Sequence, residues 1–282
     1  MLTSASIDGF SIHGGDNGVG LFNTDLGSPS PRVVADLRPT QHGATDRTIL
    51  YNARSLELRG KLEADTREAL WALLDDLKGF LALGSDHVLK VRREGESTDL
   101  RTTFRVDGPV LVGLSAGMVA SYLDWSVVIF CPDPRLYSDT LSSGSYDPTD
   151  TGEGGLTFSL DFELVFEGDG TATLDVVNEG NIATPPTLTI TGPVVNPKVT
   201  NETTGEAIQT TGLDLDTDET IVIDVAARQA YLGGTTARPD LIDSSTTTWF
   251  DLDPGTNQLR LTGSGMSATE TELAVEWRSA RI

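Results

Sequence analysis

Only one segment of this 282-residue chain carries apolar residues at helical spacing. Leu70, Leu73, Leu74, Leu77 and Leu81 recur every three or four residues, which predicts one amphipathic helix. Elsewhere the apolar residues form short runs between turn residues. A chain of this length with a single helical stripe must build most of its structure from strands, so the pattern favours a mostly β fold.

The ends of the helix are also marked in the sequence. Asp65 followed by Glu68 has the form of a capping box, which bonds free N–H groups at a helix start. Gly84 can end the helix in a left-handed turn. Trp71 and Phe80 are expected to join the leucines in the core rather than to line a cofactor site.

Short strands are predicted on both sides of the helix. Ser55–Leu62 alternates strictly between polar and apolar residues, as a half-buried strand does. The segments 87–92, 100–106 and 125–130 predict three more strands. Strands packed on one helix give an α+β layout for this part of the chain.

The second half of the chain has a different pattern. A stretch rich in Ser, Gly, Asp and Thr, residues 138–155, is expected to be a loop or linker. Short strands separated by turn signals follow, which favours a β-sandwich of roughly eight to ten strands. The sequence therefore predicts two domains, residues 1–138 and 139–282. The expected strands are 156–162, 172–177, 187–191, 198–201, 220–225, 229–232, 258–262 and 273–277.

Charge excludes several classes of partner. The chain has 42 acidic and 20 basic residues, a net charge of -22, which repels nucleic acid and anionic membrane surfaces. Residues 1–138 carry 18 acids and 14 bases, whereas residues 139–282 carry 24 and 6. No membrane helix or signal peptide is expected, and the one cysteine, Cys131, leaves no intrachain disulfide.

Motifs for catalysis are weak. Gly113-Leu-Ser-Ala-Gly117 fits the pattern of a serine nucleophile turn, but His13, His42 and His87 all precede it, against the order of that hydrolase fold. The segment is expected to connect two strands instead. The histidines lack the spacing of a zinc site, so no catalytic or metal-binding residue is predicted among them.

One acidic turn is a candidate calcium site. Asp214, Asp216 and Asp218 resemble the start of a calcium loop, but Glu219 and Val225 stand where an EF-hand needs Gly and Glu. The alternative is a solvated turn before a strand, and no cofactor is predicted.

The stretch 125–137 carries the most informative motif. An alternating strand runs into Pro-Asp-Pro, and neither proline can donate to a sheet. Asp133, Pro134, Arg135 and Tyr137 then form an Asp-Pro-Arg-x-Tyr segment that resembles the domain junction of phage distal tail proteins. These residues are interpreted as structural markers of the junction, with no catalytic role.

Other segments extend this resemblance along nearly the whole chain. The resemblance implies an N-terminal β-rich domain with one helix, followed by a galectin-like β-sandwich. It also implies a homo-oligomer, a hexameric ring at the virion tail tip, made in the host cytoplasm. That ring would join the tail tube protein to the tail-tip hub and receptor-binding proteins. The matching segments are 51–60, 178–180, 185–193, 201–205 and 252–257.

Two alternatives to a structural tail protein stay open. A carbohydrate-binding module would recognise a host surface glycan, with Trp249 or Tyr231 stacking on a sugar. Trp249 and Trp277 are, however, expected to be core residues of strands. An enzyme such as a cell-wall hydrolase has no motif to support it, so we expect a non-enzymatic tail hub. The chain has no long insertion that could add a second binding module, which weighs against direct receptor recognition.

Overall fold

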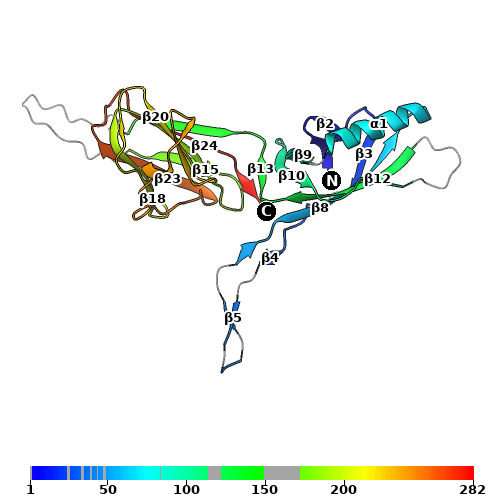
Figure 1. Ribbon diagram of the computed structural model, residues 1–282, viewed down its shortest axis with the longest axis horizontal. Helices are drawn as coiled ribbons and strands as arrows, with labels where there is room; N and C mark the ends of the chain where they lie inside the picture. The colour runs from blue at the N-terminus through cyan, green and yellow to red at the C-terminus, as the bar shows by residue number, and fades with distance from the viewer. Residues whose placement is uncertain are drawn as a thin grey trace, which may run out of the picture. The chain divides into compact units, whose positions relative to one another are not determined.

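The computed structural model describes residues 2–23, 26–32, 35–38, 40–42, 44–46, 49–82, 84–113, 122–148 and 172–282. It divides into two compact units (Figure 1): the first holds Met1–Thr140 with Arg281–Ile282, and the second holds Leu141–Ala280. Strands dominate both units, so the predicted mostly β fold is confirmed. Among the described residues, no helix is long and apolar enough to cross a membrane.

The first unit is built on one ten-stranded sheet. Its strands are β1 (Leu2–Ile7), β2 (Phe10–His13), β3 (Val19–Asn23), β8 (Arg54–Glu63), β9 (His87–Arg93), β10 (Leu100–Val106), β11 (Leu111–Gly113), β12 (Tyr122–Cys131), β13 (Leu136–Ser138) and β25 (Ala280–Arg281). The main path runs β2-β1-β9-β10-β12-β8-β3, and neighbours along it are antiparallel. At the end of the chain, Arg281 returns to this unit and donates to Glu96 at 2.9 Å.

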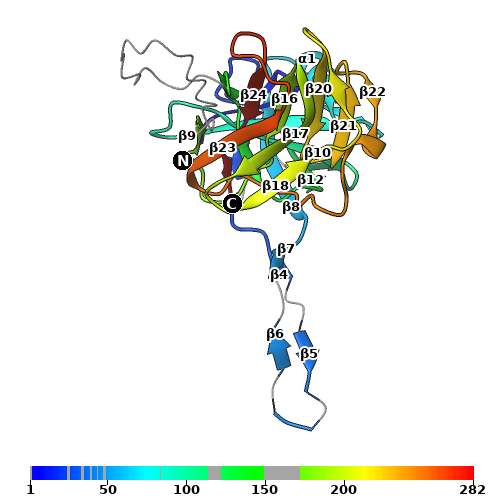
Figure 2. The same cartoon turned by 90° about the vertical axis from the view of Figure 1, so that its left-hand side faces the viewer.

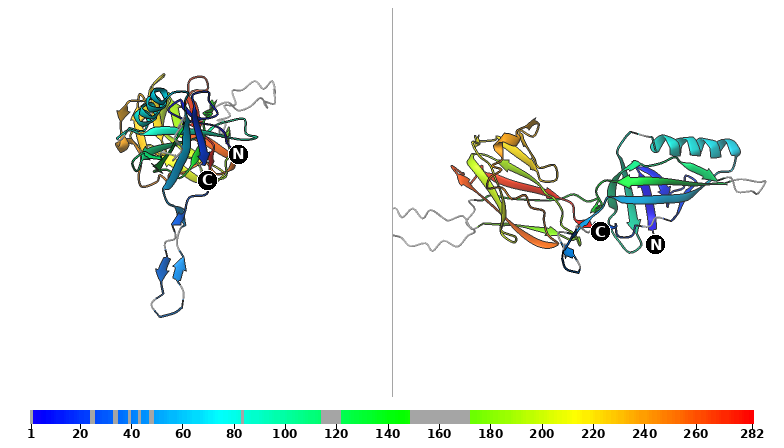
Figure 3. Two further views of the ribbon diagram at one scale, coloured as in Figure 1. Left: turned by 90° about the vertical axis from the view of Figure 1, so that its right-hand side faces the viewer. Right: turned by 60° about the horizontal axis from the view of Figure 1, so that its bottom comes forward.

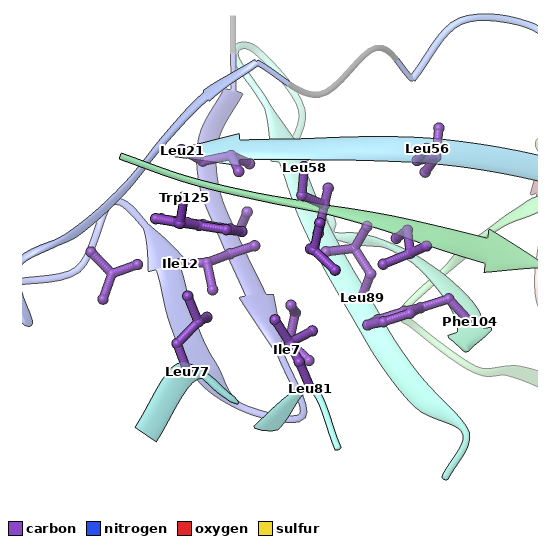
Figure 4. Packing of buried hydrophobic residues seen from close by; sticks show 14 of the residues in the cluster. Ile7, Ile12, Leu21, Leu56, Leu58, Leu77, Leu81, Leu89, Phe104 and Trp125 are labelled. Atoms are coloured by element: carbon purple, nitrogen blue, oxygen red, sulfur yellow. The ribbon is translucent and has the colours of Figure 1, made fainter. Parts of the chain in front are cut away.

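The long pair β8 and β12 organises the core of the first unit. Their register is unbroken from Tyr122 opposite Glu63 to Cys131 opposite Arg54. Trp125 lies opposite Gly60, where a Cβ atom would stand 2.7 Å from the indole ring. The missing side chain therefore lets the tryptophan lie flat across the strand, among the buried residues shown in Figure 4.

Helix α1 (Arg67–Phe80) lies along one face of these strands, as the right-hand view of Figure 3 shows. Four leucines of the predicted stripe are buried, and Leu73 is partly buried against the same core. The start of the helix differs from the prediction, because Thr66 rather than Asp65 is the cap, with its hydroxyl accepting the Ala69 N–H at 3.2 Å. Glu68 is then the second helical residue, one position too early to complete a capping box.

The predicted helix end and one predicted core residue are wrong. The helix ends with Leu81 as its cap at a negative φ of -103°, and Gly84, with a positive φ of 91°, follows three residues later. Trp71 is 46% exposed, because it lies about a quarter turn around the helix from the leucine stripe. Phe80, on the opposite border of that stripe, stacks on Phe10 with ring centroids 4.5 Å apart.

The shifted cap gives a simple test. Replacing Thr66 by alanine removes the hydroxyl that accepts the Ala69 N–H, so we expect a loss of about 1 kcal/mol in unfolding free energy. Denaturant unfolding of the full chain measures it. Asp65→Ala is the matched control and should change stability less; a larger loss for Asp65→Ala would contradict the cap assignment.

The second unit consists of two antiparallel sheets whose facing side chains form a separate core. One sheet has the order β14-β24-β16-β20-β21-β22, and the other β15-β23-β17-β18 with β19 beside β17. A short 3-10 turn, η1 (Pro239–Leu241), follows β22. The strands are β14 (Ser142–Tyr146), β15 (Leu174–Asn178), β16 (Thr187–Thr191), β17 (Val194–Asn201), β18 (Glu206–Gln209), β19 (Asp214–Leu215), β20 (Thr220–Asp224), β21 (Gln229–Leu232), β22 (Thr236–Ala237), β23 (Gly255–Ser264) and β24 (Glu272–Trp277).

The predicted loop at residues 138–155 is wrong in part, because it contains the strand β14. This strand pairs with β24 from Ser142 opposite Trp277 to Tyr146 opposite Leu273. Its sequence lacks apolar alternation, and pairing with its neighbour holds it in place. The predicted strand at residues 156–162 lies outside the described residues.

Candidate assembly site

A long hairpin leaves the main sheet of the first unit between β3 and β8. We call the described residues of the range 26–53 the arm; it contains β4 (Pro31–Arg32), β5 (Ala35–Leu37), β6 (Ala44–Asp46) and β7 (Leu50–Tyr51). β4 pairs with β7 and β5 with β6, and in the described part of the chain neither pair joins another strand (Figures 1 and 2). A two-stranded ribbon is marginally stable on its own in water. The arm is therefore a candidate for docking on another protein surface.

Apolar side chains at the base of the arm are exposed. Ile49, Leu50 and Tyr51 are consecutive and between 42% and 57% exposed, and Phe22, at the end of β3, is 67% exposed. Consecutive exposed apolar residues of this size are typical of an interaction surface. The arm thus presents the edges of a two-stranded ribbon and exposed apolar side chains to a partner.

A buried arginine fastens the arm to the sheet. Arg54, only 3% exposed, begins β8 where the arm ends. Its Nη1 donates to the carbonyls of Leu26 and Gly27 at 3.1 and 2.8 Å, on the entering side of the arm. Its Nε donates to the carbonyl of Pro134 at 3.1 Å. One guanidinium therefore ties both ends of the arm to the segment that leaves β12.

That segment carries the predicted junction motif. Asp133 accepts the backbone N–H of Arg135 at 2.9 Å and the hydroxyl of Tyr137 at 2.5 Å. Burial, together with the hydrogen bond to Asp133, raises the pKa of Tyr137 well above its usual value of 10.0, so the phenol stays a donor. The motif forms a self-bonded turn, and the carbonyl of Pro134 receives Arg54. Its assignment as a family marker stays a prediction.

The face of β12 that points away from the core has a second apolar surface. Val128 and Phe130, 39% and 37% exposed, alternate with buried residues along this strand. Leu111, 61% exposed, lies on the neighbouring strand opposite Ser126. The first unit therefore presents apolar side chains on its sheet as well as on its arm.

In the second unit, three asparagines from the segments that suggested the resemblance are buried and hydrogen-bonded. Asn178 donates through Nδ2 to the carbonyls of Ile182 and Leu252 at 2.8 and 3.0 Å. Its Oδ1 accepts the N–H groups of Gly180 and Ala280 at 3.0 and 3.3 Å. One amide thus joins the turn after β15, the segment before β23 and the end of the unit.

The other two asparagines lie side by side. Asn201 donates to the side-chain oxygen of Asn257 at 3.3 Å, and that oxygen also accepts the Asp253 N–H at 3.0 Å. Asn257 in turn donates to the Asp253 carbonyl at 2.8 Å. These residues close turns of the sandwich, so this part of the sequence pattern has a structural reason.

The two candidate glycan contacts are half-buried. Trp249 packs against the core of the second unit, and Tyr231 lies on β21 opposite Val222. Trp277, predicted to be core, is 8% exposed, with its indole N–H donating to the Val177 carbonyl at 2.9 Å. Glycan binding at Trp249 or Tyr231 stays a prediction.

The candidate calcium residues lie on a tight acidic turn. The N–H of Asp216 donates to the carboxylate of Glu219 at 3.0 Å, and the N–H of Glu219 donates to the Asp216 carbonyl at 3.1 Å. Asp214 and Asp218 are exposed beside them. Among the described residues, no group of three or more His, Cys, Asp or Glu side chains is placed to hold a metal ion. Calcium binding at this turn stays a prediction.

The remaining sequence motifs fall in separate places. Gly113 ends β11, and the rest of the Gly113–Gly117 motif lies outside the described residues. His13 ends β2 and His42 lies exposed in the arm, whereas His87 is buried at the start of β9.

The sequence offered no sign that Arg54 would be buried, because charged residues at strand starts are usually solvated.

Comparison with known protein families finds a match within the second unit. Residues 179–279 match the family model of the siphovirus-type tail component, C-terminal domain. That range contains Asn201 and Asn257 and begins directly after Asn178. No curated protein sequence matches the chain.

Solved structures extend the similarity to the whole chain. The Dit protein of phage SPP1, a paradigm of the hub adsorption apparatus in phages that infect Gram-positive bacteria, is similar over 97% of both chains, with a TM-score of 0.66 and 13% identity. Chains of the phage P2 baseplate in its activated conformation are also similar over 97% of both chains. The structure with Ca gives a TM-score of 0.52 at 14% identity, and the structure with Sr gives 0.51 at 13%. The predicted resemblance to distal tail proteins is confirmed.

Proposed function

We propose that this chain is a structural subunit of a phage tail hub, located in the virion at the tail tip. The observation that carries the proposal is a shared fold over 97% of both this chain and the SPP1 Dit protein, together with the tail-component match at residues 179–279. Its partners would be copies of itself in a hexameric ring, the tail tube protein, and the tail-tip hub and receptor-binding proteins. Synthesis in the host cytoplasm and no enzymatic activity belong to the same proposal.

The arm supports a ring of identical subunits. A hairpin of one copy that docks on a different surface of the next copy makes a head-to-tail contact, and such contacts form a ring when the rotation from one copy to the next closes. The exposed apolar residues of the arm and of the outer face of β12 lie in the first unit. Residues 139–282, with a net charge of -18, would repel their own copies. We therefore place the ring contacts in the first unit.

The arm contact can be tested by substitution. The double variant Leu50→Ser with Tyr51→Ser removes apolar area that is exposed in the single chain, so we expect loss of the ring with little change in the unfolding transition of each subunit. Mass photometry measures the loss. Val177→Ser, which changes a residue of the second unit with 43% exposure, is the control and should assemble normally. Equal assembly by the double variant and the control would contradict the arm contact.

A further inference from the structure

His87 is buried in the first unit between two acceptors. Its Nδ1 lies 2.7 Å from Oδ2 of Asp8, in the turn between β1 and β2. Its Nε2 lies 3.1 Å from the carbonyl oxygen of Ala82, just after α1. The other oxygen of Asp8 accepts the Val88 N–H at 2.8 Å, so the carboxylate is held in place from β9.

This geometry requires two protons on one ring. A carboxylate and a carbonyl only accept hydrogen bonds, so each ring nitrogen must carry a hydrogen to bond both. Neutral imidazole has only one N–H and can satisfy one side at a time. Its other nitrogen would then face an acceptor with a lone pair.

The surroundings of His87 favour the charged ring. Burial alone would lower the pKa of His87, but the hydrogen bonds to Asp8 and to the Ala82 carbonyl, with the charges of Asp8 and Asp86, outweigh it and raise the pKa above 6.5. Asp86 is itself paired with Arg105 of β10 at 2.5 Å. Phe104 of β10, which pairs with His87 in the sheet, has its ring centroid 5.5 Å from that of His87 and carries no charge.

We propose that His87 is a proton-operated latch that holds the β1–β2 turn and the segment after α1 together only while both ring nitrogens are protonated. In the neutral ring the single N–H stays with the Asp8 carboxylate, because a bond to a charged acceptor is the stronger one. The Ala82 carbonyl then loses its donor. Ala82 also lines an apolar pocket of about 560 Å³ with Leu81, Val106 and Pro109. Loss of the hydrogen bond to the Ala82 carbonyl therefore frees a residue in the wall of that pocket.

The direction of the pH dependence follows from the raised pKa. A raised pKa in the folded state means that the latch stabilises the first unit fully below about pH 6.5, the unfolded value of histidine. This stabilisation is lost as the pH rises through the folded pKa of His87. The second unit contains no histidine and should show no such step.

The test is hydrogen exchange and ring NMR on the full chain. The Leu81 N–H bonds the Leu77 carbonyl at 3.1 Å, directly before Ala82. Between pH 5.5 and 8.5, we expect exchange of the Leu81 amide, corrected for the intrinsic rate, to rise by about tenfold, the worth of one charge-assisted hydrogen bond. The ring-nitrogen signals, assigned by their absence from a His87→Gln spectrum, should report a doubly protonated ring at pH 5.5.

Two variants separate the latch from a general pH effect. Asp8→Asn keeps an oxygen for the Val88 N–H and places an amide N–H₂ against Nδ1, so a neutral ring can accept from this amide and still donate from Nε2 to the Ala82 carbonyl. Exchange should therefore stay slow at both pH values, without the rise expected in the wild type. Asp99→Asn breaks the surface ion pair with Arg92, which lies on β9 together with His87. This control should keep the wild-type pH dependence of exchange. Equal corrected exchange at both pH values in the wild type, or a neutral His87 ring at pH 5.5, would overturn the proposal.

Discussion

Replacing Asn178 by alanine is expected to lower the unfolding free energy of the second unit by about 3 kcal/mol, because buried polar groups lose their partners. Four backbone groups bond this one amide, and two of those bonds, to the Leu252 carbonyl and the Ala280 N–H, are fully buried. The turn cannot relax easily, because a Cβ atom at Gly180 would already collide with the Ala280 carbonyl.

Denaturant unfolding of the full chain, followed by tryptophan fluorescence, measures this loss. Trp249 and Trp277 report on the second unit, and Trp71 and Trp125 report on the first. Glu179→Ala changes the exposed neighbour of Asn178 and should leave the transition within about 0.5 kcal/mol of the wild type. If Asn178→Ala lowers the unfolding free energy no more than Glu179→Ala does, the hydrogen bonds of the Asn178 amide do not stabilise the second unit.

The second large effect is expected at Arg54. Arg54→Met keeps much of the side-chain volume but leaves the carbonyls of Leu26, Gly27 and Pro134 without this donor, which should cost the first unit about 3 kcal/mol. The base of the arm should loosen as well, since both of its ends are fastened there. Cleavage by chymotrypsin near Leu50 and Tyr51 should therefore become faster.

Arg59→Met on the same strand is the matched control. Arg59 is exposed and pairs with Glu57 on the surface, an arrangement that contributes little to stability. The comparison uses the same substitution, strand and assays. Equal stability and equal cleavage rates for the two variants would contradict the role of Arg54 as the fastening of the arm.

The sequence predicted the elements that depend on periodicity alone. The spacing of the leucines predicted α1, and the alternation of polar and apolar residues predicted β8 and most of β12. The helix cap was misplaced by one residue, because Asp65 and Thr66 are both good caps and local geometry chose the hydroxyl. The strand β14 was missed, because pairing with a distant strand rather than its own composition holds it.

The candidate assembly site was less predictable. The arm has two short paired segments and few core-facing residues, so its pattern resembles that of a loop. Arg54 could not be identified, because its partners are backbone carbonyls distant in sequence. By contrast, the turn-rich segments that carry the sequence resemblance contain Asn178, Asn201 and Asn257, but the burial of their side chains is visible only in the structure.

The central claim is that this chain assembles into a ring, and the mass of the purified particle tests it most directly. Mass photometry, with negative-stain imaging of the same sample, should show closed rings of about 180 kDa, six copies of the 30.1 kDa chain. A closed two-fold dimer would contradict the claim. A particle of 30.1 kDa at every concentration, also after mixing with tail tubes, would contradict it too.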